Sequence, residues 1–265
     1  MQRDVSSRII LNVTEPADLV FSVAVSGHYT PNREVFAASL DGEPVPSTEI
    51  FDAHGTRLHR VESGTGRLTI EYSAIVLGLG DTAIARDIDV LTYLRPSRYA
   101  QSDELAATAA AEFAGIDNHT DLLAAVSSWV GTRLAYVPGS SLPTDGATRT
   151  LLARQGVCRD YAHLCVALLR ALGVAARLVS VYAPGLSPMD FHAVAEAWID
   201  GGWRVVDATT LAPRSTLVRI ATGRDAADTA LLNVVSGRVD FLEMEVTATA
   251  DVLPDDDLTQ LVSIS

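Results

Sequence analysis

The chain has 265 residues, of which 48% are hydrophobic and 20% charged, a balance typical of a folded globular protein rather than a disordered one. Its formal net charge of −13 at pH 7 argues against nucleic acids and anionic membrane surfaces as partners. No apolar run reaches the ~18 residues of a membrane span, and the first residues lack a secretory signal pattern. We therefore expect a cytoplasmic protein with no membrane partner.

Residues 1–95 predict a β-rich domain. Runs of β-branched or alternating residues recur at short intervals, and Gly, Pro, Asn and Asp residues separate them. Regular short strands joined by such turns favour a β-sandwich-like module. The expected strands cover 8–13, 19–25, 34–40, 48–51, 57–61 and 67–72.

The pattern changes around Pro96, so we predict a second domain covering residues 96–265. Here the apolar residues recur at helical spacing, and Ser, Thr and Asp residues stand where they would cap helix N-termini. Strand-like segments follow these helices, which predicts an α+β domain of helices packed on an antiparallel sheet. Helices are expected at 102–114, 122–134 and 147–154, and strands at 174–182, 193–199, 203–206, 231–235 and 241–251.

The segment after Gly156 predicts the central helix of this domain. It runs from Cys158 to about Leu172, with apolar residues at helical spacing, and Val166 and Ala167 fill much of the remaining surface. A helix that is hydrophobic over most of its circumference is normally buried. We therefore expect this helix at the core of the domain.

Cys158 stands at the start of that helix. Unpaired N–H groups and the helix dipole put partial positive charge there, which favours the thiolate form of a cysteine. Cys165 is expected to be a buried apolar residue. A disulfide between the two is not expected, because a helix would separate them by about 10 Å at ~1.5 Å per residue.

A thiolate nucleophile needs a base and a group that orients the base. His192 opens a strand-like run, and Asp207 closes the strand that follows the turn at 200–202. The order Cys158, His192, Asp207 therefore predicts a triad. His192 would move the proton, and Asp207 would fix its tautomer and stabilise the imidazolium.

The stretches GVCRDYAHL at 156–164 and FHAVAEAWIDGGWRVVDAT at 191–209 resemble the transglutaminase-like superfamily, in its bacterial branch of cysteine peptidases. The resemblance covers about 91–232. It implies a papain-like core that points Cys158 at the sheet edge carrying His192, with Cys-His-Asp catalysis. The chain departs from the family pattern in small ways, for example at Ala208, where the family usually has Pro.

The hairpin that carries His192 and Asp207 must place both side chains on one face. A two-residue turn at Gly201-Gly202 would leave them about 13 Å apart, at ~3.3 Å per residue. This turn is therefore incompatible with a hydrogen bond between them.

A four-residue loop at 199–202 satisfies the condition. It pairs Trp198 with Trp203 and sets Asp207 opposite Val194, so that His192 is a diagonal neighbour of the carboxylate. We predict this wider loop, or an equivalent bulge, together with a Trp198–Trp203 contact.

The oxyanion of an acyl-transfer reaction would be stabilised by the backbone N–H of Cys158, with Gln155 or Tyr136 as the second donor. Four further polar residues are expected to be mainly structural. His163 lies on another side of the helix, Glu196 shares the strand face of His192 as a solvated or hydrogen-bonded carboxylate, and Arg159 and Asp160 form an ion pair or shape the rim of the site.

These observations predict a cysteine peptidase or amidase that acts through a Cys158 thioester on a peptide or amide substrate, without metal or cofactor. Three alternatives stay open: a transglutaminase, in which an amine resolves the thioester; a coenzyme A-dependent N-acyltransferase; and a non-enzymatic binding scaffold. A peptide deglycosylase would be expected to carry paired zinc cysteines, which two cysteines cannot supply. The sequence leaves the natural substrate and the oligomeric state open.

Overall fold

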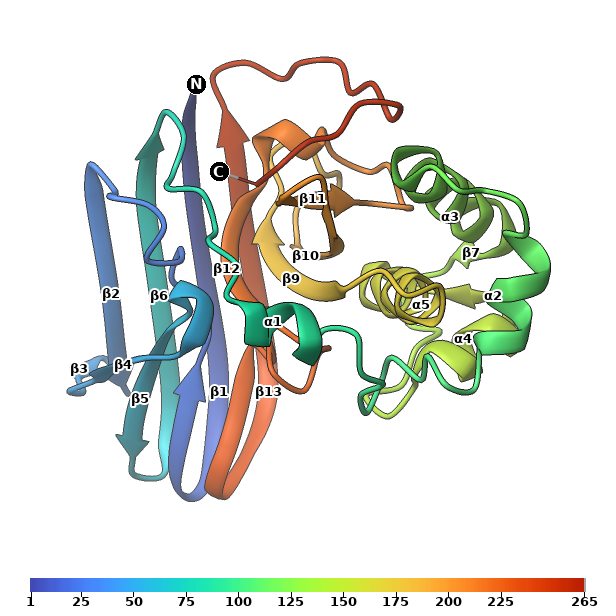
Figure 1. The fold of residues 1–265 in the computed structure, drawn as a ribbon. Helices are drawn as coiled ribbons and strands as arrows, with labels where there is room; N and C mark the ends of the chain where they lie inside the picture. Colours follow the sequence, from blue (N-terminus) through green and yellow to red (C-terminus); the bar gives the residue numbers. More distant parts are fainter. Residues whose placement is uncertain (265) are drawn as a thin grey trace.

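The computed structural model describes residues 1–264, which contain three β-sheets and a group of helices (Figure 1). A long curled sheet lies at one side of the molecule and a four-stranded sheet lies next to it. The helices cover the other side of the smaller sheet. This arrangement confirms the α+β class and the strand-rich N-terminal region.

The curled sheet is antiparallel, with the strand order β3-β2-β6-β1-β5-β4 and with β13 paired to β1. The long strand β1 (Gln2–Phe21) pairs with β6 along its first part and with β5 along its last part. Register shifts in the β1–β13 pairing let the strands bend as β-bulges do, so the sheet folds back on itself. The other strands are β2 (Arg33–Leu40), β3 (Glu43–Pro44), β4 (Thr48–Phe51), β5 (Arg57–Ser63), β6 (Gly66–Leu77) and β13 (Leu232–Ala250), and a 3-10 turn covers Ala53–Gly55.

Two pairs of predicted strands are continuous in the structure. The predicted runs 8–13 and 19–25 fall largely within β1, and the runs 231–235 and 241–251 fall largely within β13. The polar residues between the members of each pair suggested a turn. In the structure β1 and β13 pair with each other across these residues, with register shifts, and both strands bend back there (Figure 1). The expected turns are therefore present as bends within two continuous strands.

The pairing of β13 with β1 brings the two ends of the chain together in one sheet. The predicted division into residues 1–95 and 96–265 therefore runs between two strands that hydrogen-bond to each other. Residues 79–86, which form no helix or strand and are largely exposed, connect the sheet to the helical part. The division stays a prediction about which parts fold separately.

The helices are α1 (Asp87–Thr92), α2 (Ala106–Glu112), α3 (His119–Arg133), α4 (Ala147–Ala153) and α5 (Cys158–Ala171). The short α1 was not predicted. α2 is shorter than expected. α3 begins earlier than expected, because the Asn118 side chain accepts hydrogen bonds from the N–H groups of Thr120 and Asp121 at 2.8 and 3.1 Å and so caps the helix.

The four-stranded sheet has the order β11-β10-β9-β12, and α5 lies against β10 and β9. Every residue of α5 from Asp160 to Arg170 is buried, which confirms the predicted central helix. The strands are β9 (Ala176–Tyr182), β10 (Phe191–Ile199), β11 (Gly202–Val206) and β12 (Val218–Gly223); two short strands, β7 (Ala135–Tyr136) and β8 (Gln155–Gly156), pair in parallel, and a 3-10 turn covers Arg214–Thr216.

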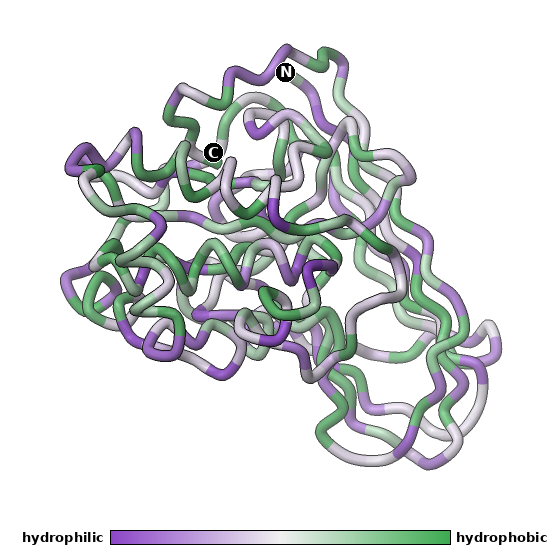
Figure 2. Tube along the Cα trace, turned by 90° about the vertical axis from the view of Figure 1, so that its right-hand side faces the viewer, coloured by the Kyte–Doolittle hydropathy of each residue, from purple (hydrophilic) through white to green (hydrophobic). Residues whose placement is uncertain are grey.

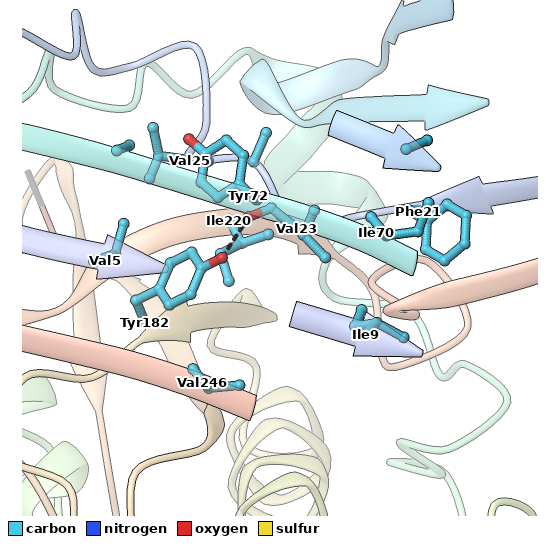
Figure 3. Packing of buried hydrophobic residues seen from close by; sticks show 14 of the residues in the cluster. Val5, Ile9, Phe21, Val23, Val25, Ile70, Tyr72, Tyr182, Ile220 and Val246 are labelled. Carbon is cyan, nitrogen blue, oxygen red and sulfur yellow. Dashed lines mark hydrogen bonds between the residues drawn. The ribbon is translucent and has the colours of Figure 1, made fainter. Parts of the chain in front are cut away.

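The two larger sheets share one hydrophobic core, which includes Val218 and Ile220 of β12 as well as residues of the curled sheet. Tyr182 of β9 reaches into this core, where its hydroxyl donates a hydrogen bond of 2.8 Å to the carbonyl of Val23 (Figure 3). Buried residues alternate with more exposed ones along much of β1, as expected for strands with one buried face, and hydrophobic and hydrophilic residues are interspersed along the backbone of the molecule (Figure 2). The sheets are therefore held together by packing as well as by strand pairing.

Candidate active site

Cys158 is the first residue of α5 and is half-buried, whereas Cys165 is completely buried. Both are free thiols. Burial raises the pKa of Cys165, and the charge of Asp207 raises it further, so this thiol stays protonated and inert. The two cysteines thus occupy the environments predicted for them.

Asp160 fixes the start of α5. Its carboxylate accepts hydrogen bonds from the N–H of Val157 at 2.8 Å and from the hydroxyl of Ser141 at 2.9 Å, and the Arg159 guanidinium lies 3.4 Å away. A Cβ on Gly156 would come within 2.7 Å of the Cβ of Asp160, so only glycine allows this approach. The expected ion pair of Arg159 with Asp160 is confirmed.

His192 and Asp207 meet through a short hydrogen bond. Nε2 of His192 lies 2.8 Å from Oδ2 of Asp207, and the two residues are 2% and 3% exposed. The other carboxylate oxygen accepts hydrogen bonds from the hydroxyl and the N–H of Thr209, at 2.6 and 2.9 Å. Thr209 was not predicted, although an Asp followed two residues later by Thr is a common local turn motif.

The hairpin between β10 and β11 has the predicted register. Trp198 pairs with Trp203, and their rings lie 5.3 Å apart between centroids. The predicted four-residue loop is wrong, however, because Ile199 also pairs with Gly202. The turn is the two residues Asp200 and Gly201, whose φ angles of 50° and 71° are those of a type I′ turn, for which Asp-Gly is a favoured sequence.

The charges around His192 favour a protonated imidazole. Burial by itself lowers the pKa of His192, but the charge of Asp207 and its hydrogen bond, followed by the interactions with Cys158, raise the pKa to about 10. Nδ1 is buried and has no hydrogen bond of ordinary geometry within residues 1–264. Since Nε2 faces Asp207, Nδ1 is the nitrogen left to exchange a proton with the neighbouring thiol.

Tyr136 is the second polar group at Cys158. It pairs with Gly156 through β7 and β8, and both the main chain and the thiol of Cys158 influence the pKa of its hydroxyl. Burial, followed by the charge of Cys158, raises the pKa of Tyr136 to about 12, so the hydroxyl keeps its proton at neutral pH. Gln155, the other predicted donor, is exposed on β8.

Two further residues proved to have well-defined structural partners. Glu196 is completely buried between Arg177 and Arg219, at 2.7 and 2.6 Å, so it is hydrogen-bonded rather than solvated. His163 accepts a hydrogen bond from the N–H of Ala226 at 3.1 Å, and burial lowers its pKa to about 3. His163 therefore stays neutral and holds a loop that lies near the candidate site.

Cys158 and His192 both line a cleft with a volume of about 670 Å³, which falls in the range of small-molecule sites.

Within residues 1–264, no cluster of three or more His, Cys, Asp and Glu side chains could hold a metal ion. No helix in this described part of the chain is long and apolar enough to cross a membrane.

Comparisons with known proteins place the chain in a family. The family model of the transglutaminase-like superfamily matches residues 107–208, a segment that contains all three predicted triad residues. A solved structure from Cytophaga hutchinsonii, named a "putative cysteine protease", is 33% identical to this chain, with a TM-score of 0.88 and with 98% of this chain and 96% of that chain covered.

Two uncharacterized mycobacterial proteins are also similar. The match with a protein of Mycobacterium leprae is 27% identical over 158 residues, 55% of each chain. The match with a protein of Mycobacterium bovis is 36% identical over 124 residues, 41% of this chain and 39% of that one. This chain thus spans about half the length of the first relative and less of the second. The family model and the full-length structural match together show that the chain belongs to the transglutaminase-like superfamily.

Proposed function

We propose that this protein is a cysteine peptidase or amidase that hydrolyses an amide bond through a thioester on Cys158. The observation that carries the proposal is the shared position of Cys158 and His192 in one cleft, with His192 hydrogen-bonded to the buried Asp207. The name of the Cytophaga hutchinsonii relative supports a peptide substrate. A cytoplasmic location, which the sequence favours, remains part of the proposal.

In the proposed reaction, the Cys158 thiolate attacks the amide carbonyl carbon while His192 is protonated. The backbone N–H of Cys158 and the hydroxyl of Tyr136 donate hydrogen bonds to the oxyanion that forms. The C–N bond then breaks, and the departing amine takes the proton from His192. Water attacks the thioester, gives a proton to His192, and releases the carboxylic acid and the free cysteine.

Asp207 would act on His192 rather than on the substrate. Its carboxylate accepts the Nε2–H bond and stabilises the imidazolium, as the carboxylate of a hydrolase triad does. Thr209 holds the second carboxylate oxygen. The carboxylate is therefore kept in one orientation, and the imidazole is kept with Nδ1 toward Cys158.

The experiment uses a mixture of internally quenched peptides and, separately, a glutamine peptide with a fluorescent primary amine. We expect peptide cleavage, and an acyl group on the Cys158 peptide in mass spectra after rapid acid quenching. Incorporation of the amine without hydrolysis would instead indicate a transglutaminase. An additional requirement for coenzyme A would indicate an acyltransferase.

Cys158→Ala and His192→Ala should each reduce cleavage by at least about a thousandfold. Iodoacetamide should label Cys158 and leave Cys165 unlabelled in the folded protein. The thermal melt of Cys158→Ala should be nearly unchanged, because the residue is half-buried at a helix start. Retained cleavage in either variant would contradict the proposed mechanism.

A further inference from the structure

The cleft beside Cys158 is lined mainly by apolar side chains, and neither Asp nor Glu is among its lining residues. Apart from the proposed catalytic pair Cys158 and His192, Arg159 is the one residue with a charged side chain among the described residues that line the cleft. The Arg159 guanidinium donates hydrogen bonds to the hydroxyl of Ser141 and the carbonyl of Leu142, neither of which lines the cleft. The larger apolar lining residues are Leu178, Phe191, Ile220, Leu231 and Leu232.

Two distant parts of the chain build the walls of this cleft. One wall comes from the start of α5 and from β10, with Cys158 and His192. The other comes from the curled sheet, through Ser22 at the end of β1 and Leu231–Asn233 at the start of β13. The N–H of Ser22 donates a hydrogen bond of 2.9 Å to the carbonyl of Leu231. The cleft therefore exists only where the curled sheet meets the helical part.

Small side chains keep the rim of the cleft open. Ala226, Ala227 and Ala230 lie in the loop between β12 and β13 and line the cleft. Two hydrogen bonds fix this loop: His163 accepts one from the N–H of Ala226, and Asp225 accepts one from the N–H of Tyr99 at 2.9 Å. A fixed loop with methyl side chains leaves room for a large group next to Cys158.

We propose that this cleft binds a large uncharged apolar group, an aromatic or branched aliphatic side chain, beside the amide bond that Cys158 attacks. The inference rests on the proposed function, since it takes Cys158 as the attacking residue. Apolar walls gain from the removal of apolar ligand surface from water. Outside the proposed catalytic pair, the one charged side chain of the lining, Arg159, is already engaged by Ser141, Leu142 and Asp160, so an ionised group would lose its hydration there without gaining a new partner. The curled sheet is thereby assigned a part in substrate selection.

The test compares three alkylating reagents that share one reactive group: iodoacetamide, N-benzyl iodoacetamide and N-carboxymethyl iodoacetamide. The rate of modification of Cys158 in the wild-type protein is followed by mass spectrometry and divided by the rate with glutathione. We expect the benzyl reagent to exceed iodoacetamide by about tenfold or more, in line with the discrimination that apolar pockets achieve. The normalised rate with the carboxymethyl reagent should not exceed the rate with iodoacetamide.

A variant then tests the place where the benzyl group binds. Ala227 is exposed at the rim of the cleft, so Ala227→Trp should fill the space without disturbing the core. It should abolish the benzyl preference, which is measured as the ratio of the benzyl rate to the iodoacetamide rate in the same variant. Ala110→Trp, a matched change at an exposed position of α2 outside the cleft, should keep the preference.

Equal normalised rates for the three reagents, or a benzyl preference that survives Ala227→Trp, would overturn the proposed apolar site. Peptide turnover is measured on the same samples. A benzyl preference without any turnover supports the apolar site and contradicts only the hydrolase proposal. Turnover without the preference contradicts only the apolar site.

Discussion

At the scale of residues, the site depends on which atom of each side chain meets its neighbour. His192 uses Nε2 for Asp207, so Nδ1 is the nitrogen available to Cys158. The hydroxyl of Thr209 donates to the other oxygen of Asp207, and Asp160 holds the start of the helix that carries Cys158. Each contact removes one freedom of rotation, so the reacting groups need little reorganisation before attack.

Asp207→Asn should lower kcat/KM by roughly a thousandfold, because an amide cannot stabilise the imidazolium and permits the wrong tautomer. Loss of the buried charge pair should also destabilise the protein at neutral pH, by about 2 kcal/mol. Steady-state kinetics and thermal melts of both proteins measure these effects. Activity within tenfold of wild type would exclude Asp207 as the orienting group.

The same pair predicts a pH dependence of stability. The pKa of His192 is raised to about 10, so its contribution is complete below the ordinary histidine pKa of about 6.5 and is lost as the pH rises through 10. The pKa of Asp207 is lowered, so its contribution is complete above about 3.9 and is lost in acid. The stability advantage of wild type over Asp207→Asn should therefore be largest between about pH 3.9 and 6.5, shrink as the pH rises from there toward 10, and shrink again in acid, as measured by urea unfolding.

Tyr136→Phe should reduce kcat by about 10- to 100-fold with little change in KM, because an oxyanion donor acts mainly in the transition state. Tyr161→Phe is a matched control. The Tyr161 hydroxyl donates to the carbonyl of Leu134 at 2.8 Å, so its removal should lower stability by about 1 kcal/mol and leave kcat nearly unchanged well below the melting temperature. Equal kcat values for the two variants would exclude Tyr136 as a donor.

The three candidate triad residues could be predicted from the sequence, whereas the residues that position them, such as Thr209, could not. Cys158, His192 and Asp207 are each linked to a recognisable helix start or strand end. Thr209 and Tyr136 differ in this respect. The role of Tyr136 depends on the parallel pairing of two very short strands, which no periodicity in the sequence reveals.

At the scale of elements, β9, β10 and β12 are joined by a buried charge network as well as by main-chain hydrogen bonds. Glu196 lies between Arg177 and Arg219, and all three residues are at most 1% exposed. Burial by itself raises the pKa of Glu196, but the charges of Arg219 and Arg177 lower it to about 2. The carboxylate is therefore ionised across the neutral range.

Glu196→Gln should destabilise the protein by about 3–5 kcal/mol, because two buried guanidinium groups lose their counter-charge. Glu71→Gln, which breaks the exposed pair with Arg8, should change stability by less than about 1 kcal/mol. Since the pKa of Glu196 is lowered, the difference from wild type should be present above about pH 4.3 and disappear as the pH falls toward 2. Urea unfolding at several pH values measures both changes.

The hairpin shows what pattern reasoning can and cannot fix. Its register followed from the requirement that His192 and Asp207 share a face, and the structure confirms it. The predicted loop of 199–202 was too long, because the two-residue turn that was rejected lay at Gly201-Gly202, whereas the turn in the structure is Asp200-Gly201. A two-residue turn at Asp200-Gly201 keeps the predicted pairing of Trp198 with Trp203 and also pairs Ile199 with Gly202.

At the scale of the whole molecule, the curled sheet and the helical part share a core and a pair of strands. Their separation into the predicted domains 1–95 and 96–265 is therefore best tested without removing either part. A protease should cut first in the exposed segment 79–86. We expect the two pieces to co-elute in size-exclusion chromatography and to separate only in denaturant.

Separation of the nicked pieces under native conditions would instead indicate two independent domains.

The sequence could place the change from strand to helix near Pro96, because that change alters the spacing of apolar residues. It could not show that β13 returns to β1, because strand partners that are distant in the chain leave no local signal. The cleft could not be predicted from the sequence for the same reason, since Ser22 and Leu231 line it and lie far apart in the chain.

The partnership of β1 with β13 also has a consequence for the order of events on the ribosome. β1 is translated before its partner strand β13, which begins at Leu232 and follows after a delay of about 10–40 s at synthesis rates of ~5–20 residues per second. During this interval one long edge of the nascent sheet lacks its final partner and can pair with other extended chains. Completion of the sheet, and with it of the cleft wall formed by Leu231–Asn233, is thus a late step that follows release of the C-terminal strand.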